Sequence, residues 1–179
     1  MDPSFIYYIN LPIVIGPLDI DEMHSVLESV ENKQGPKVLV IRGKNPNKFC
    51  HGMNLKYLKK FGMQAAIRLS ESILKVCARI MKQNCPILCV INGHCIAGGM
   101  AIAITADYLI MDLDSGTLRM SEVLINLVIP RSIMMLIKEK LSPADFRDLI
   151  LRPKIFNAKE ALKAKIIDEA IPKEQLESR

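Results

Sequence analysis

The stretch 87–106 carries no charged side chain, and no other feature constrains the fold of this chain as strongly. An apolar run of this length could cross a bilayer as a helix. However, Pro86 opens the run, the turn-forming sequence Asn-Gly-His interrupts it at 92–94, and the glycine pair 98–99 would weaken a continuous helix. We therefore expect two buried elements joined by a turn, and no membrane span.

The two expected elements are a β-branched strand at 87–91 and a helix of small residues at about 98–106. A helix that begins at glycine leaves free backbone N–H groups, which a ligand can approach closely. That arrangement suits an anion or an oxyanion. Tight packing of a buried strand and helix explains the glycines about equally well. A P-loop is excluded, because Gly99-Met100 stands where Lys-Ser/Thr would be needed.

Strand and helix patterns alternate through the rest of the chain. Strands are expected at 5–11, 37–42, 108–111 and 117–120, and helices at 19–32 (capped by Asp19 or Asp21), at 62–83, and after Pro130, Ser142 and Asn157. The polar segment 43–54 is expected to be a loop without an element of its own, at a position where function is common. This alternation predicts an α/β fold with parallel pairing, and the lack of a linker predicts one domain over 1–179.

Charge and cysteine content exclude several function classes. The formal net charge of +5 is dispersed, and Lys56, Lys59 and Lys60 form the densest basic group. This argues against nucleic-acid binding and indicates a solvated helix face, or else contact with a small phosphorylated ligand such as a nucleotide-containing thioester. The five cysteines form no CxxC pair, so no metal site is expected, and reduced thiols indicate an intracellular compartment. Neither terminus carries a readable targeting signal, and the chain ends Glu-Ser-Arg.

Five spaced segments together resemble the enoyl-CoA hydratase/isomerase (crotonase) superfamily over residues 37–172: KVLVIRG, KFCHGMNL, PILCVINGHCIAGG, GTLRMSEVLINLVIP and FNAKEALKAKIIDEAIP. The single glutamate in MSEV is most similar to 3,2-enoyl-CoA isomerases of the plant peroxisomal type. The resemblance implies a spiral of ββα units, here shortened at both ends and without the usual C-terminal trimerisation helices. It also implies a homo-oligomer, a trimer by resemblance, or a subunit of a complex, in a peroxisome or mitochondrion.

The resemblance also assigns roles to particular residues. The backbone N–H groups of His51 and Gly98 would form an oxyanion hole for a thioester, with Cys50, Gly52, Asn54 and Gly99 beside the substrate. Glu122 would be the catalytic base, and Ala101 stands where hydratases of the family carry a second glutamate. A lone carboxylate can shuttle one proton, which is what moving a double bond from the 3- to the 2-position of an enoyl-CoA requires. No cofactor is implied, since CoA is part of the substrate.

Other interpretations remain open at this point. The chain could be an inactive crotonase-fold subunit that is structural or binds acyl-CoA, and Glu122 could be an ordinary surface carboxylate. A hydratase would require another acid. Lys165 stands where the family usually has glycine, so we expect mild backbone strain there if the position has a positive φ.

Overall fold

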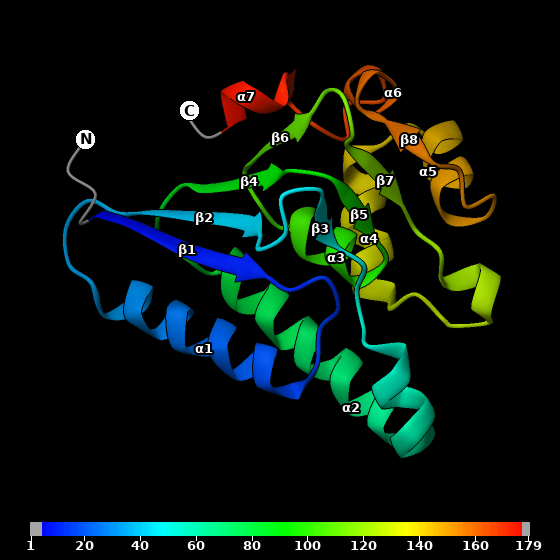
Figure 1. Cartoon of the computed structure of the whole chain (residues 1–179), viewed down its shortest axis with the longest axis horizontal. Coiled ribbons are helices and arrows are strands. Elements are labelled where there is room, and N and C mark those ends of the chain that lie inside the picture. The colour runs from blue at the N-terminus through cyan, green and yellow to red at the C-terminus, as the bar shows by residue number, and fades with distance from the viewer. Residues whose placement is uncertain (1–4, 177–179) are drawn as a thin grey trace.

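The computed structural model describes residues 5–176 (Figure 1). The remaining terminal residues, on which the expectations about targeting signals depend, lie outside the described residues. In chain order the elements are β1 (Ile6–Leu11), α1 (Pro17–Asn32), β2 (Val38–Gly43), β3 (Lys48–Cys50), α2 (Leu55–Met81), β4 (Ile87–Ile91), β5 (His94–Ile96), α3 (Gly98–Ala103), β6 (Tyr108–Asp112), β7 (Thr117–Arg119), the 3₁₀ helix η2 (Glu122–Ile125), α4 (Arg131–Lys140), α5 (Pro143–Ile150), β8 (Phe156–Asn157), α6 (Ala158–Lys163), β9 (Glu169–Ile171) and α7 (Lys173–Leu176).

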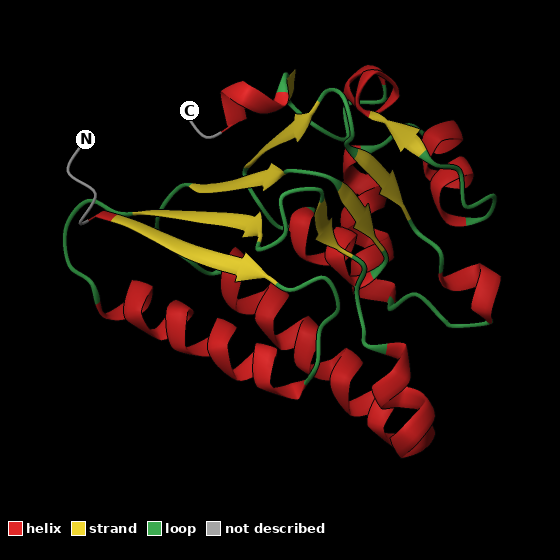
Figure 2. Cartoon of the chain, in the orientation of Figure 1, coloured by secondary structure: helices red, strands yellow, loops and turns green. Residues whose placement is uncertain are grey.

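The strands form two sheets (Figure 2). The larger sheet has the order β1-β2-β4-β6-β9 and is parallel throughout, and the smaller has the order β3-β5-β7-β8 with only β8 antiparallel. Each consecutive pair, β2 and β3, β4 and β5, or β6 and β7, gives one strand to each sheet before the chain continues into a helix. This is the expected spiral of ββα units, and the α/β prediction is confirmed.

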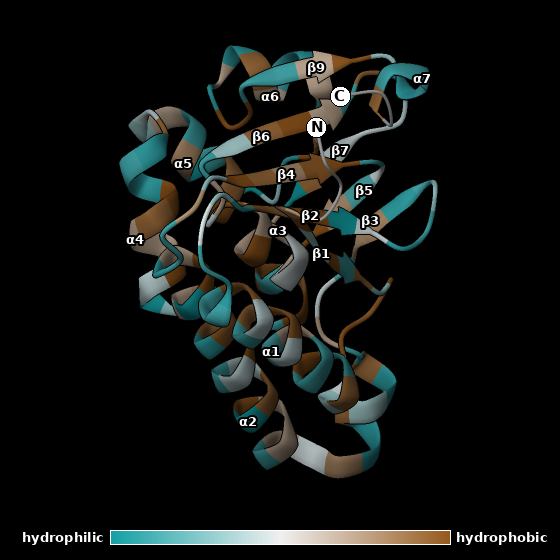
Figure 3. Ribbon diagram, turned by 90° about the vertical axis from the view of Figure 1, so that its left-hand side faces the viewer, coloured by the Kyte–Doolittle hydropathy of each residue, from teal (hydrophilic) through white to brown (hydrophobic). Residues whose placement is uncertain are grey.

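The core lies between the sheets and the helices. Strand β2 has fully buried Leu39 and Ile41, as its continuous apolar sequence predicts for a central strand. Figure 3 shows hydrophobic residues concentrated along β4 and β6 of the larger sheet. Helices α1 and α2 lie side by side below that sheet in Figure 1. This packing holds α3 and the carboxyl ends of β3 and β5 in fixed positions.

Three expectations were wrong, two in the segment after β2 and one in the segment after β4. The expected loop 43–54 contains β3, which is too short to have a readable period. The next helix begins at Leu55, not Gly62, because the Asn54 side chain caps it by accepting the N–H of Tyr57 at 3.1 Å. Gly62 (φ 77°, ψ −173°) instead interrupts α2. The turn at 92–94 also leads directly into β5, which the apolar pattern did not reveal.

The helix caps agree with the sequence in two of three cases. Ser142 caps α5 and Asn157 caps α6, as expected. Helix α1 is capped by Gly16, not by an aspartate, while Asp19 Oδ2 accepts the Gly16 N–H at 2.8 Å from the first turn. Lys165 has a φ of 56°, so the conditional expectation of backbone strain applies.

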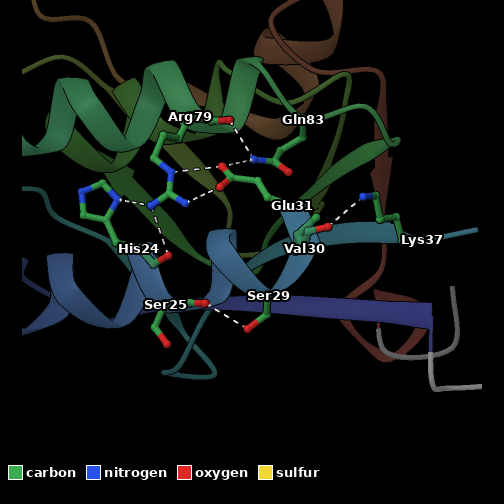
Figure 4. Close-up of polar contacts among 8 residues, drawn as sticks. All are labelled: His24, Ser25, Ser29, Val30, Glu31, Lys37, Arg79 and Gln83. Atoms are coloured by element: carbon green, nitrogen blue, oxygen red, sulfur yellow. Dashed lines mark hydrogen bonds and ion pairs between the residues drawn. The ribbon is translucent and has the colours of Figure 1, made fainter. Parts of the chain in front are cut away.

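A polar cluster joins α1 to α2 (Figure 4). The Arg79 guanidinium donates to both carboxylate oxygens of Glu31, at 3.1 and 2.6 Å, and to the His24 carbonyl at 3.2 Å. Gln83 Nε2 also donates to Glu31, at 3.0 Å. These hydrogen bonds, with that of Arg79 first, hold the pKa of Glu31 below its ordinary value. The cluster fixes the angle at which α2 crosses α1.

Replacing Arg79 by methionine is expected to destabilise the protein at pH 7 by about 1 kcal/mol, because the pair is only partly shielded from solvent. Glu31 stabilises the fold above its unfolded pKa and loses this contribution as pH falls through its lower folded value. The cost of Arg79→Met in chemical denaturation should therefore shrink below pH 4.5. Lys44→Met, which breaks the more exposed pair with Glu22, is the matched control and should cost less. An equal cost for both would contradict this role.

Candidate active site

A cavity of about 410 Å³ lies between α2, the start of α3 and the segment 120–133. Its walls are mostly apolar, with few polar groups facing the interior. The lining residues are His51, Met53, Leu55, Met63, Ala66, Ile67, Ser70, Glu71, Ile73, Leu74, Ala97, Gly98, Ala101, Met120, Ser121, Glu122, Ile125, Asn126, Leu127, Val128, Ile129, Pro130 and Ile133. Such a cavity suits an aliphatic chain with one reactive polar end.

The start of α3 presents free backbone N–H groups to this cavity. Ala97 precedes the helix with φ 53° and ψ −120°, a strained conformation for a residue with a side chain. Its own N–H donates to the Arg119 carbonyl at 2.9 Å, which anchors it to β7. Among the described residues, the N–H of Gly98 has no acceptor. Gly98 therefore fits the expected role of an oxyanion donor.

The backbone N–H of His51, expected as the other donor, is not available. It donates to the Ile13 carbonyl at 2.7 Å, so that expectation was wrong. Met53 lies two residues further along the chain and pairs in parallel with Ile15. The N–H groups that form this pairing are those of Ile15 and Asn54, not that of Met53. Its N–H has no acceptor within the described part of the chain, and its nitrogen lies 3.7 Å from where a Cβ on Gly98 would stand. Met53 and Gly98 are thus the pair of free donors.

Gly52 keeps these two donors accessible. A Cβ at this position would lie 2.6 Å from the Gly98 nitrogen, and Gly52 has a φ of 79°. A side chain there would strain the backbone and cover the Gly98 N–H. Gly99 has a different role, because its Cβ would lie 2.3 Å from the Cys50 carbonyl oxygen. It lets α3 pack directly on β3.

Glu122 begins η2 and faces the cavity. The turn is closed by the Leu127 N–H, which donates to the Glu122 carbonyl at 3.0 Å, and by Asn126 in the left-handed conformation. The carboxylate Oε2 is buried and has no hydrogen-bond partner among the described residues. Burial raises the pKa of Glu122, while the backbone N–H groups of Glu122 and Ser121 oppose this shift. An unpaired carboxylate with a raised pKa is suited to exchanging a proton with a ligand.

The His51 ring also lines the cavity. Its Nε2 is buried and unpartnered among the residues that the structure describes. Burial lowers the pKa of His51, and the nearby Lys48 and His94 lower it further. The lowered pKa favours the uncharged form of the ring, which adds a polar edge to the cavity.

The four residues expected beside the substrate do not line the cavity. Cys50 is fully buried behind it, where burial raises the pKa of its thiol to about 12, and Asn54 is committed to capping α2. Gly52 and Gly99 shape the backbone as described above. The cavity wall is instead supplied by α2 and by the segment after Glu122. The apolar residues of α2 have the helical spacing that is also typical of ordinary core residues. No local pattern marks Met53 as a donor, because its free N–H follows from the pairing of 51–54 with 13–15.

Two features of the described residues bear on other functions. No group of three or more His, Cys, Asp or Glu side chains among them is placed to hold a metal ion. Likewise, none of the helices within residues 5–176 combines the length and apolar character needed to cross a membrane.

Comparison with known proteins identifies relatives of the chain. Residues 17–179 match the family model described as enoyl-CoA hydratase/isomerase. Enoyl-CoA delta isomerase 2, peroxisomal, from Arabidopsis thaliana is 32% identical over 160 residues, covering 86% of this chain and 67% of that protein. Enoyl-CoA delta isomerase 3 from the same plant is 30% identical over 158 residues, covering 86% and 66%. The chain thus spans about two thirds of the length of these relatives.

A solved structure supports the fold. An enoyl-CoA hydratase/isomerase family protein from Pseudomonas syringae superimposes with a TM-score of 0.90 at 21% identity, covering 99% of this chain and 77% of that one. At this identity the likeness concerns the fold alone.

Proposed function

The chain belongs to the enoyl-CoA hydratase/isomerase family, and from this premise we propose that it is an isomerase that moves the double bond of a 3-enoyl-CoA to the 2-position. The observation that carries the proposal is Glu122 Oε2, which is buried without a hydrogen-bond partner among the described residues, in the cavity that Met53 and Gly98 also line. Ala101 lines the same cavity and offers no second acid. One carboxylate suffices for isomerisation, and the isomerase-named plant relatives support this choice over hydration.

The proposed reaction moves one proton from C2 to C4 of the substrate in two steps. The Glu122 carboxylate removes a proton from C2 of the 3-enoyl thioester, and the negative charge spreads onto the thioester oxygen. The N–H groups of Met53 and Gly98 stabilise this enolate, each by about 3 kcal/mol. The same Glu122 carboxyl then delivers the proton to C4, which leaves the double bond between C2 and C3 conjugated with the carbonyl. Because Oε2 has no partner, no other described side chain competes for that proton.

The wider setting is proposed from the relatives. The reaction belongs to fatty acid beta-oxidation and requires no cofactor besides the CoA of the substrate. It takes place in the peroxisome or the mitochondrion, as the names of the Arabidopsis and mouse proteins say of those enzymes. We also keep the single domain over 1–179 and the homotrimer as proposals. The apolar cavity supports an aliphatic acyl chain as the part of the substrate that enters the protein.

An isomerase assay tests the proposal. The purified chain is mixed with a trans-3-enoyl-CoA, and the ultraviolet absorbance of the conjugated 2-enoyl thioester is followed. We expect the absorbance to rise, with a product of unchanged mass. A gain of one water would indicate a hydratase. Thermal stabilisation by acyl-CoA without turnover would instead support an inactive acyl-CoA-binding subunit.

The acid limb of the pH profile of kcat/KM is expected to lie above pH 4.5, the ordinary value for glutamate, because burial raises the pKa of Glu122. The carboxylate is the reactive form, so the rate should fall as pH decreases through this raised value. Steady-state rates with the 3-enoyl-CoA between pH 4 and pH 9 measure it, with circular dichroism at each pH as the control for folding. A limb at or below pH 4.5 in a folded protein would contradict a buried base.

A further inference from the structure

The mouth of the cavity is an exposed apolar rim formed by two segments. From α2 come Leu55, Met63 and Ile67, with exposed fractions of 53%, 67% and 44%. From the segment around η2 come Ile125 and Val128, with 48% and 88%. All five side chains line the cavity and also face solvent. Figure 1 shows the start of α2 and the segment after β7 on the same side of the molecule.

The chain segment that supplies the α2 side of the rim is cationic, although Lys44 within it is paired with Glu22. The segment 44–70 contains six Lys or Arg residues and no Asp or Glu: Lys44, Lys48, Lys56, Lys59, Lys60 and Arg68. Lys56, Lys59 and Lys60 are exposed in the first two turns of α2, and Lys60 Nζ lies 5.2 Å from the centre of the exposed Phe61 ring. Gly62 then separates these turns from the rest of α2. A short cationic helix with apolar side chains therefore stands at the cavity mouth.

We propose that the rim, defined as Leu55, Met63, Ile67, Ile125 and Val128, docks with its neighbouring lysines on an anionic lipid surface. Apolar side chains beside lysines are typical of helices that lie in the interface of a membrane. Each lysine near an anionic leaflet is attracted to the lipid headgroups, and contact of the rim's apolar side chains with the lipid adds to this binding. The proposal goes beyond the isomerase function and does not depend on it, since lipid binding is measured without substrate.

Charge complementarity favours a lipid surface over a second copy of this chain. Two copies meeting through this face would bring their lysines at 56, 59 and 60 together with no facing carboxylate in 44–70. Two acids line the cavity: Glu122 is half-buried and Glu71 is exposed, which leaves one exposed carboxylate beside the three exposed lysines of α2. An anionic lipid surface supplies the missing negative charge and accepts the apolar side chains at the same time.

Vesicle sedimentation with the full chain tests the proposal. Large unilamellar vesicles of phosphatidylcholine with 30% phosphatidylserine, a composition in the range of roughly −30 mV surface potential, are compared with pure phosphatidylcholine vesicles. We expect partition to the anionic vesicles, lost in high salt. The double variant Lys56→Glu, Lys60→Glu should lower the partition coefficient by at least about 30-fold, from two lysines near the surface.

The chain offers a matched control in α6. Lys159 and Lys163 have the same four-residue spacing and are exposed. Figure 1 shows α6 at the top of the molecule and α2 at the bottom. The variant Lys159→Glu, Lys163→Glu changes net charge equally and should keep nearly all binding. A third variant, Met63→Ser with Val128→Ser, should also lose binding while all lysines remain.

Three results would overturn the proposal. These are no partition of the folded wild type to anionic vesicles, an equal loss in the α2 and α6 lysine variants, and self-association that Met63→Ser with Val128→Ser abolishes. Circular dichroism and thermal melts of each variant establish that the fold is intact, so that a loss of binding reports on the surface. Analytical ultracentrifugation of the wild type and the serine variant measures self-association.

Discussion

Replacing Glu122 by glutamine is expected to lower kcat for 3-enoyl-CoA isomerisation by about 10³-fold. Glutamine keeps the shape of the side chain but can neither remove the proton from C2 nor return it at C4. Because Ala101 carries no carboxyl group and Glu71, the other acid among the described lining residues, is exposed, we expect little residual rate. The measurement is a comparison of steady-state kcat in wild type and variant.

Glu71→Gln is the matched control for this variant. Glu71 also lines the cavity but is exposed, so its replacement should change kcat by less than about threefold. The Glu122→Gln protein should be at least as stable as wild type, since it no longer places an unpaired charge in a half-buried site. Equal kcat for wild type and Glu122→Gln would remove this residue from the mechanism.

Replacing Gly52 by alanine is expected to lower kcat by about 10²-fold. The added Cβ would lie 2.6 Å from the Gly98 nitrogen, so the methyl group must displace the backbone that supplies this oxyanion donor. Acyl-CoA binding should weaken less than turnover, because the charge on the thioester oxygen develops only during the reaction. Rates and thermal stabilisation by acyl-CoA separate the two effects.

Gly35→Ala controls for the backbone strain that any side chain at positive φ creates. Gly35 has a φ of 86°, similar to the 79° of Gly52, but no atom lies within 4 Å of its added Cβ. Both variants should lose about 1–2 kcal/mol of stability from the left-handed conformation. Only Gly52→Ala should lose catalysis. An equal effect of both on kcat would show that strain, not access to the Gly98 N–H, is responsible.

The fold could be predicted from the sequence wherever an element had a readable period or cap. Strand 87–91, the caps Ser142 and Asn157, and the central position of β2 all follow from local patterns. The smaller sheet could not be predicted, because β3 and β5 have three residues each and become strands only by pairing, β3 with β5 and β5 also with β7. Their stability comes from tertiary contacts between residues distant in sequence.

The candidate site was predicted in part, for a similar reason. Gly98 and Glu122 are where the sequence placed them, in one cavity. The choice of His51 as a donor failed because an N–H is free or occupied according to its pairing, here with the Ile13 carbonyl. A segment's sequence does not reveal a backbone partner from another part of the chain. The register between 13–15 and 51–54 therefore decides that Met53, not His51, has a free N–H beside the cavity.

The path of the proton tests the central claim most directly. A 3-enoyl-CoA carrying two deuterium atoms at C2 is converted in ordinary water, and the product is analysed by NMR at early conversion. If the buried Glu122 carboxyl carries the hydrogen from C2 to C4, a fraction of the product molecules will hold one deuterium at each of these carbons. Product with solvent hydrogen alone at C4, even in a single turnover, would contradict a one-carboxylate shuttle.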